Sequence, residues 1–136
     1  MAKTFEDLRA FQRAVDFMVD VYAATESFPA RELYGLTTQM RRAACSVVSH
    51  IAEGQGRLTY GEWRQMLSQG RGSLYEVQAQ IIASERLGFL QPVVAEHLRT
   101  SSRTAGRELA GLIDWVKKRE AQAKRPRTPK SQATSN

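Results

Sequence analysis

Apolar residues recur every three or four positions along most of the chain, which is the period of an α-helix with one buried face. No stretch shows the apolar-polar alternation of a half-buried strand. The pattern therefore predicts an all-α protein. The clearest stripe comprises Leu33, Leu36, Met40, Ala43, Val47 and Ile51. A second stripe near the amino terminus comprises Leu8, Phe11, Val15, Met18 and Tyr22.

Start and stop signals divide the periodic region into separate helices. Thr4 and Thr59 are each followed three residues later by an acid, which is typical of a helix N-cap. Gly54 and Gly56 are expected to end a helix, because glycine readily adopts the positive φ found at many helix ends. The predicted helices cover residues 5–27, 30–54, 60–87 and 92–121.

Long helices joined by short connections favour an antiparallel, up-and-down four-helix bundle. We assign residues 1–122 to this single domain and expect 123–136 to form a disordered basic tail, since the tail lacks aromatic and long aliphatic side chains. Gly70 and Gly72 lie inside the third predicted helix, where glycine is unfavourable. A closely approaching neighbour would compensate for that cost.

The positive charge is unevenly distributed along the chain. The net charge is +6, and the four cations of residues 124–136 account for most of it, leaving +2 on the bundle. Residues 31–107 contain ten arginines, no lysine and six acids. Arginine matches phosphate and carboxylate groups with a planar set of donors, so this segment indicates either nucleic-acid binding or specific ion pairs. Pairing with surface glutamates explains the pattern equally well.

Several arginines occupy positions that suggest a shared surface. Arg41 and Arg42 are adjacent on a predicted helix, so their side chains diverge by about 100°. Glu53, in the last turn of that helix, calls for a nearby cation such as Arg57 or Arg41, and an ion pair is a better explanation for it than catalysis. Arg41, Arg42 and Arg57 are candidates for phosphate contacts, as are Arg64 and Arg71, which lie a heptad apart on the third predicted helix. Arg99, Arg103 and Arg107 recur every four residues on the fourth and would form a ridge that contacts consecutive phosphates.

The sequence offers little support for an enzyme. His50 and His97 lie on different predicted helices without a metal-ligand or nucleophile motif, so we predict no metal, cofactor or catalytic residue. Trp63 and Trp115 fit core or interface positions, with base stacking as the alternative. No signal peptide or membrane span is evident, and we expect a cytoplasmic protein.

Five motifs resemble a bacterial family of four-helix-bundle proteins. This family comprises the proteins encoded in intervening sequences of large-subunit ribosomal RNA genes and the accessory variability determinant of diversity-generating retroelements. The motifs are Phe5-x-Asp7-Leu8, Phe28-Pro29 with Glu32-x-Tyr34-Gly35-Leu36, Gln39-x-Arg41-Arg42-Ala43-Ala44, Ile51-Ala52-Glu53-Gly54-x-Gly56-Arg57 and Gly72-Ser73-Leu74-x-Glu76.

This resemblance implies a homopentameric ring with a basic surface that binds nucleic acid and, in the retroelement branch, a reverse transcriptase. We therefore expect a non-enzymatic oligomeric bundle that binds RNA or DNA mainly through backbone phosphates. The alternative is a protein-interaction scaffold, such as a reverse-transcriptase accessory protein, whose arginines serve assembly or docking.

Overall fold

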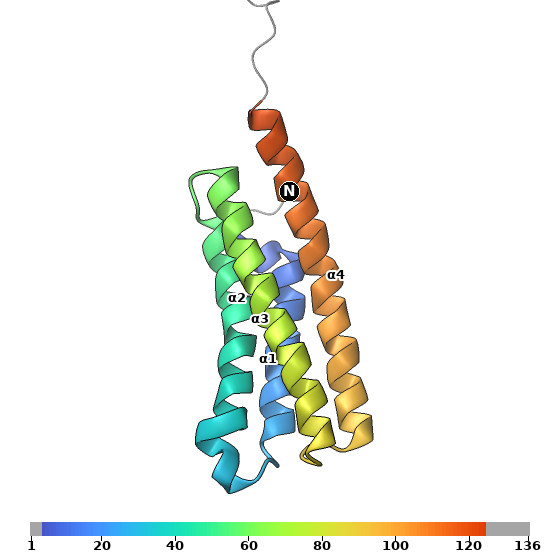
Figure 1. Cartoon of the computed structure of the whole chain (residues 1–136). Helices are drawn as coiled ribbons and strands as arrows, with labels where there is room; N and C mark the ends of the chain where they lie inside the picture. The colour runs from blue at the N-terminus through green and yellow to red at the C-terminus, as the bar shows by residue number, and fades with distance from the viewer. Residues whose placement is uncertain (1–3, 125–136) are drawn as a thin grey trace, which may run out of the picture.

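The computed structural model describes residues 4–124, and within this range it contains four long helices and no strand (Figure 1). Each helix packs mainly against its neighbours in the cyclic order first, second, third, fourth. The predicted four-helix bundle is thus confirmed, and the predicted tail lies almost entirely outside the described residues. The helices are α1 (Arg9–Thr25), α2 (Thr38–Gln55), α3 (Tyr60–Arg86) and α4 (Pro92–Ala123).

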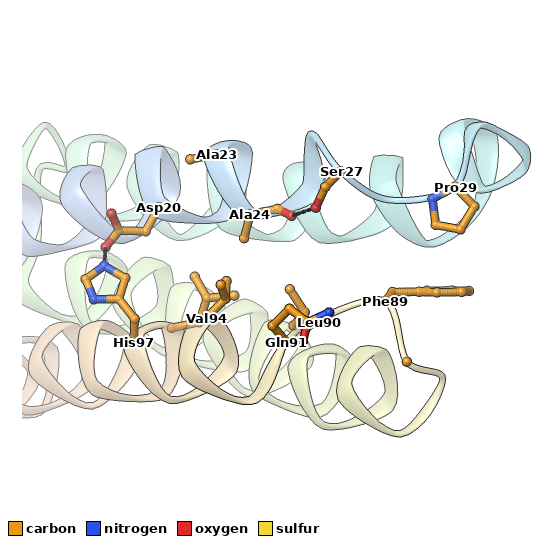
Figure 2. A pocket seen from close by; sticks show the side chains of 12 residues that line it. Asp20, Ala23, Ala24, Ser27, Pro29, Phe89, Leu90, Gln91, Val94 and His97 are labelled. Atoms are coloured by element: carbon orange, nitrogen blue, oxygen red, sulfur yellow. Dashed lines mark hydrogen bonds and ion pairs between the residues drawn. The ribbon is translucent and has the colours of Figure 1, made fainter.

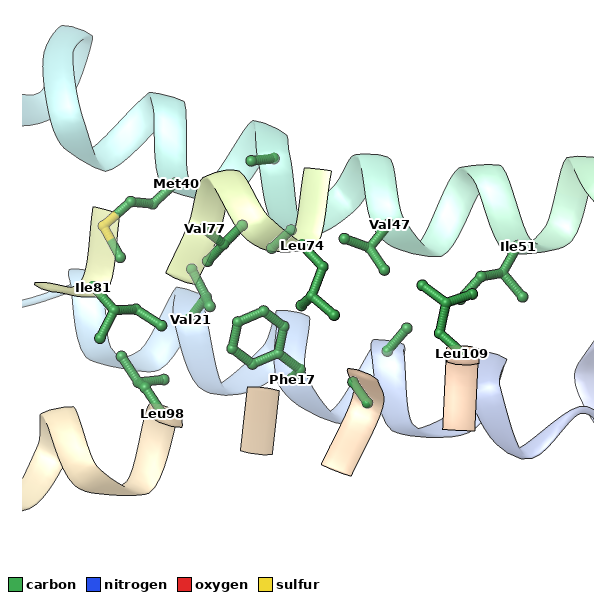
Figure 3. Close-up of a cluster of buried hydrophobic side chains, with 14 of the residues drawn as sticks. Phe17, Val21, Met40, Val47, Ile51, Leu74, Val77, Ile81, Leu98 and Leu109 are labelled. Carbon is green, nitrogen blue, oxygen red and sulfur yellow. The ribbon is translucent and has the colours of Figure 1, made fainter. Parts of the chain in front are cut away.

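All four helices contribute large apolar side chains to one continuous core (Figure 3). Phe17 of α1 lies at its centre and is fully buried. Burial of each such side chain is worth about 1.5–3 kcal/mol relative to exposure, so this core is the main source of stability. Other fully buried members are Met40, Ile51, Leu67, Leu74, Ile81, Leu98 and Leu109.

The first helix begins later than the sequence predicts. Thr4 does form the predicted capping box with Asp7, but it caps only a 3₁₀ turn, Phe5–Asp7. Leu8 then adopts an extended conformation (φ −73°, ψ 128°), so α1 starts at Arg9. As a result α1 is 17 residues long, whereas α4 has 32 residues and extends past the amino-terminal end of α1 (Figure 1).

The buried face of α1 also differs from the predicted one. The residues that enter the core are Ala10, Ala14, Phe17, Val21 and Thr25, one position before most of the expected stripe. The predicted stripe gave weight only to large apolar side chains and passed over the alanines, whose small size allows close packing. Predicted members of the stripe are displaced to the rim, and Tyr22 is 39% exposed.

The second helix is interrupted near its start. The predicted segment begins with a 3₁₀ turn, Ala30–Glu32, and a π-helical turn, Leu33–Thr37, before α2 starts at Thr38. Gly35 has non-helical dihedral angles (φ −114°, ψ −114°), which break the register of the predicted stripe. Leu33 is therefore 48% exposed instead of sharing the buried face with Met40.

Neither glycine at the end of α2 has a positive φ, and Gly54 is needed for the space that a side chain would fill. Gly56 has φ −85°, and among the described residues only Gly88, which ends α3, has a positive value (φ 81°). A Cβ atom on Gly54 would lie 2.6 Å from Cδ1 of Trp63. Glycine at this position thus makes room for an indole ring.

The two glycines inside α3 have different surroundings. A Cβ atom on Gly70 would lie 3.2 Å from Cβ of His50, so α2 approaches α3 closely here, as predicted. Gly72 has no described atom within 4 Å of the corresponding position, and the close neighbour predicted for it is not found within the described protomer.

Candidate nucleic-acid interface

Arg41 lies in the groove between α1 and α2 and is held there by several contacts. Its Nε donates a hydrogen bond to Thr25 Oγ1 at 2.9 Å, and its Nη2 donates to the Tyr22 carbonyl at 3.3 Å. The guanidinium carbon lies 4.7 Å from the centroid of the Tyr22 ring, which is a cation–π contact. These contacts join two helices of the same protomer.

Arg42 diverges from Arg41 and is exposed, with no ion pair in the described part of the chain. Arg57 lies near the end of α2, where its Nη2 is 4.0 Å from Oε2 of Glu53, the outer limit of an ion pair. The Glu53 and Arg57 side chains are 56% and 40% exposed, so this contact contributes little to stability.

A row of polar residues at heptad spacing on α3 faces α4. Arg64 Nε donates to Glu120 Oε1 at 2.6 Å, and Gln78 Nε2 donates to Ser102 Oγ at 2.6 Å. Glu85, a further heptad along, accepts from Arg99 Nη1 at 2.6 Å. These contacts form the rungs of a ladder between α3 and α4, and we call the surface along it the α3–α4 face.

Arg71 occupies the remaining heptad position of this ladder, between the rungs at Arg64 and Gln78. The flanking rungs fix the antiparallel register and place Arg71 opposite the segment of α4 around Ala110, where Gly106 and Gly111 also lie. Arg71 has no carboxylate partner among residues 4–124. Arg71 is half-buried, and its guanidinium has no anionic partner within the described bundle.

The predicted arginine ridge of α4 lies on the same face, but only part of it is free. Arg99 donates to Glu96 and to Glu85, and Arg103 reaches Glu96 at 3.4 Å. Glu96 therefore pairs with both arginines, as expected if surface glutamates explain the arginine-rich segment. Arg107 is exposed and makes no ion pair within the described range, including none with Glu108.

The ion pairs of the α3–α4 face also affect the titration of its carboxyl groups. The pKa of Glu96 is lowered, first by its hydrogen bond from Arg99 and then by that from Arg103. The pKa of Glu120 is lowered chiefly by its hydrogen bond from Arg64. Both carboxylates occupy arginines that would otherwise meet a phosphate, so among the arginines predicted for this face only Arg71 and Arg107 lack a carboxylate partner within residues 4–124.

Large apolar side chains also lie exposed in the second half of α3. Tyr75 is 60% exposed and Ile82 is 53% exposed. Ile82 lines a shallow cavity of about 250 Å³ together with Arg99 and Arg103. The α3–α4 face thus combines cations with apolar surface, a combination suited to a protein partner as well as to a nucleic acid.

Other exposed cations were not singled out in the sequence. Arg9, Arg86 and Lys117 form no ion pair within residues 4–124. They lie on three different helices, and Arg9 and Arg86 have no heptad relationship to the chosen arginines. Lys117 lies two heptads after Arg103, so heptad spacing could have found it.

A separate cavity of about 630 Å³ lies between α1 and the start of α4 (Figure 2). His97 Nε2 is 3.3 Å from Oδ2 of Asp20, and Ser101 Oγ donates to the same oxygen at 2.8 Å. A nucleophilic triad needs the imidazole to bond the hydroxyl that it activates. Here both groups bond the carboxylate instead, so this arrangement does not activate Ser101.

The described residues bring no three His, Cys, Asp or Glu side chains together as a metal site. Within the same residues, no helix combines the length and apolarity needed to cross a bilayer.

A comparison with protein-family models gives a match. Residues 6–111 match the model of a family described as 23S rRNA-intervening sequence protein, and that description names no reaction. A search of curated proteins found no match. The matched region covers α1, α2, α3 and most of α4, including Arg71, Arg99, Arg103 and Arg107.

Proposed function

The chain belongs to the 23S rRNA-intervening sequence protein family, and from this premise we propose that it is a non-enzymatic, homo-oligomeric protein that binds RNA or DNA through backbone phosphates. The observation that carries the proposal is the α3–α4 face, where Arg71 and Arg107 lie free beside Arg99 and Arg103. Given the family name, ribosomal RNA is the first nucleic acid to test, and the cytoplasm is the proposed location.

The proposed mechanism is neutralisation of phosphates with release of their counterions. Each arginine that replaces a condensed counterion makes the affinity fall more steeply as the salt concentration rises. Glu85, Glu96 and Glu120 reduce the charge of the α3–α4 face, so one protomer offers only a modest positive field. Weak binding by a single protomer is the consequence.

Assembly would multiply this field. Val19 and Tyr22 are exposed apolar side chains on α1, with 56% and 39% exposure, and α1 is diagonally opposite α3 in the bundle. Contacts between copies through α1 would leave the α3–α4 face open and repeat its arginines by symmetry. The pentamer is the stoichiometry that the family resemblance implies.

Tyr75 and Ile82 favour a second candidate function. Exposed apolar side chains beside arginines are typical of a protein-binding surface, so the same face could dock a second copy or an acidic partner such as a reverse transcriptase. In that case the arginines would serve assembly, and their replacement would dissociate the oligomer.

The test measures fluorescence anisotropy of labelled structured RNA and duplex DNA over a salt series. Full-length protein is compared with a chain ending at Lys124 and with an Arg71→Gln/Arg107→Gln variant of full length. The proposal expects the shortened chain to bind with a steep salt slope and the variant to bind more weakly at unchanged oligomer mass. Loss of the oligomer in the variant would favour the scaffold, and binding only by the longer chain would reject the α3–α4 face.

A further inference from the structure

An aromatic cavity of about 520 Å³ opens at the end of the bundle where α1 starts late. Since α1 begins only at Arg9, the last turns of α4 have no α1 residues beside them. Side chains that would continue the core are left lining a cavity. Those used below are Gln55, Tyr60, Trp63, Leu112, Trp115 and Arg119.

Three aromatic rings form one wall of this cavity. The Tyr60 and Trp63 rings are nearly parallel, with centroids 6.3 Å apart and an interplanar angle of 15°. Trp115 meets Trp63 edge to face with centroids 5.6 Å apart. Arg119 lies over the Trp115 ring at 4.8 Å, so the aromatic wall carries a cation. Such a combination of flat rings and a guanidinium suits a planar, anionic ligand.

Two polar atoms on lining residues are buried without a hydrogen-bond partner. They are the side-chain oxygen Oε1 of Gln55, an acceptor, and the indole Nε1 of Trp63, a donor. Buried polar groups are nearly always paired, because an unpaired group costs free energy. Both atoms are enclosed by protein, and Trp63 Nε1 lies on the ring edge that packs against Gly54, so an occupant of the cavity would meet the aromatic rings and not these two atoms.

The cavity lies next to the end rung of the polar ladder. Trp63 is followed by Arg64 and Arg119 by Glu120, and Arg64 and Glu120 form the end rung of the polar ladder. Adjacent helical residues diverge by about 100°, so one member of each pair serves the cavity and the other the α3–α4 face. A strand that follows the arginines would reach the cavity at its end.

We propose that this cavity binds one unstacked base of a single-stranded nucleic acid, with Arg119 contacting the adjacent phosphate. The inference rests on the proposed nucleic-acid binding and adds a base-stacking site to it. Tyr60, Trp63 and Trp115 supply the stacking surface. Stacking is tolerant of base identity, so the site selects unpaired strands over duplex without reading sequence strongly.

Intrinsic fluorescence tests the proposal directly, because the two tryptophans of the chain are both in this cavity. The full-length protein is titrated with an oligodeoxyadenylate about eight nucleotides long and with an abasic strand of equal length. Indole emission is recorded with excitation beyond the adenine absorption, and anisotropy of an end label measures binding independently. The expected result is saturable quenching by the adenine strand and none by the abasic strand.

Variants separate stacking from charge. Trp115→Leu should weaken binding of the adenine strand by at least about fivefold and leave the abasic strand unaffected. Arg119→Gln and Lys117→Gln remove equal charge from the same helix, and only the first should reduce quenching. Arg119→Gln keeps the test decisive if Trp115→Leu does not fold, which circular dichroism would reveal.

The remaining outcomes separate the two proposals. If both strands bind equally without a change in emission, the cavity does not take a base, although phosphate binding stands. If neither strand binds, this inference fails, while the titrations with structured RNA and duplex DNA decide the proposed function separately. If the cavity instead takes an apolar side chain of a protein partner, neither strand will change the indole emission. That result would overturn this inference.

Discussion

Arg64 and Glu120 join the start of α3 to the overhanging end of α4 through a 2.6 Å hydrogen bond from Nε to Oε1. Glu120 also accepts from Lys124 at 3.3 Å and is only 14% exposed. The pair is therefore the main polar contact that fixes this part of α4 to the bundle. Its neighbours Trp63 and Arg119 line the aromatic cavity, so the geometry of that cavity depends on this contact.

We predict that Glu120→Gln lowers stability in a pH-dependent way. The pKa of Glu120 is lowered, mainly by the hydrogen bond from Arg64, so the folded state favours the ionised form. This contribution is present above the ordinary carboxyl pKa of 4.5 and is lost as pH falls through the folded value. Urea unfolding at neutral and acid pH should show the wild-type advantage over Glu120→Gln shrinking below about pH 4.5.

Glu26→Gln is the matched control, because Glu26 is exposed and has no ion pair within residues 4–124. Its stability should follow that of the wild type at every pH. A Glu120→Gln deficit of constant size across the pH range would contradict the electrostatic explanation and indicate a packing defect.

Free and paired arginines of the α3–α4 face should respond differently to substitution. Arg71→Gln and Arg107→Gln should each reduce the slope of log affinity against log salt by about 1 and leave unfolding unchanged within about 0.5 kcal/mol. Arg99→Gln should lower stability as well, since it breaks the contact with Glu85. Anisotropy and urea titrations measure both quantities.

Arg9→Gln provides the control for charge alone, because Arg9 is exposed on α1, outside the α3–α4 face. An equal loss of affinity in Arg9→Gln and Arg71→Gln would show that binding depends on net charge and not on this face.

Arg41 and Arg42 offer a test of how adjacent arginines divide their roles. Arg41→Gln should destabilise the protein by about 1–2 kcal/mol, because it removes hydrogen bonds to Thr25 and to the Tyr22 carbonyl. Arg42→Gln should stay within about 0.5 kcal/mol, as expected for an exposed side chain without such contacts. Thermal or urea unfolding of the two variants decides this, and equal effects would refute the assignment.

The sequence predicted the helices correctly where the large apolar residues and the capping residues indicated the same helix. The positions Met40, Ala43, Val47 and Ile51 of the predicted stripe are buried on α2, and the predicted cap at Thr59 accepts the Glu62 N–H. The predicted buried face of α1 was wrong because the actual face includes Ala10 and Ala14, which pack closely although alanine gives only a weak apolar signal in the sequence. The kink at Gly35 could not be foreseen, since glycine is also tolerated in a regular helix.

For the candidate site, heptad spacing placed Arg64 and Arg71 on one side of α3, and the ladder follows that spacing. Spacing could not reveal which arginines are paired, because Arg64 meets Glu120 from a helix far along the chain. The aromatic cavity was equally hidden, since it exists only because α1 begins at Arg9 while α4 continues.

Glycine-to-alanine substitutions give the last prediction, with opposite signs at two positions. Gly54→Ala should destabilise the protein by about 1–3 kcal/mol, because the new methyl group would overlap the Trp63 ring, whose Cδ1 lies 2.6 Å away. Gly72→Ala should stabilise it by up to about 1 kcal/mol, since α3 gains helix propensity in open space. Urea unfolding compares both variants with the wild type, and Trp63 emission should shift only in Gly54→Ala. If Gly72→Ala is destabilising and also lowers the oligomer mass, Gly72 lies against another copy of the chain, because no neighbour within the described protomer opposes a methyl group there.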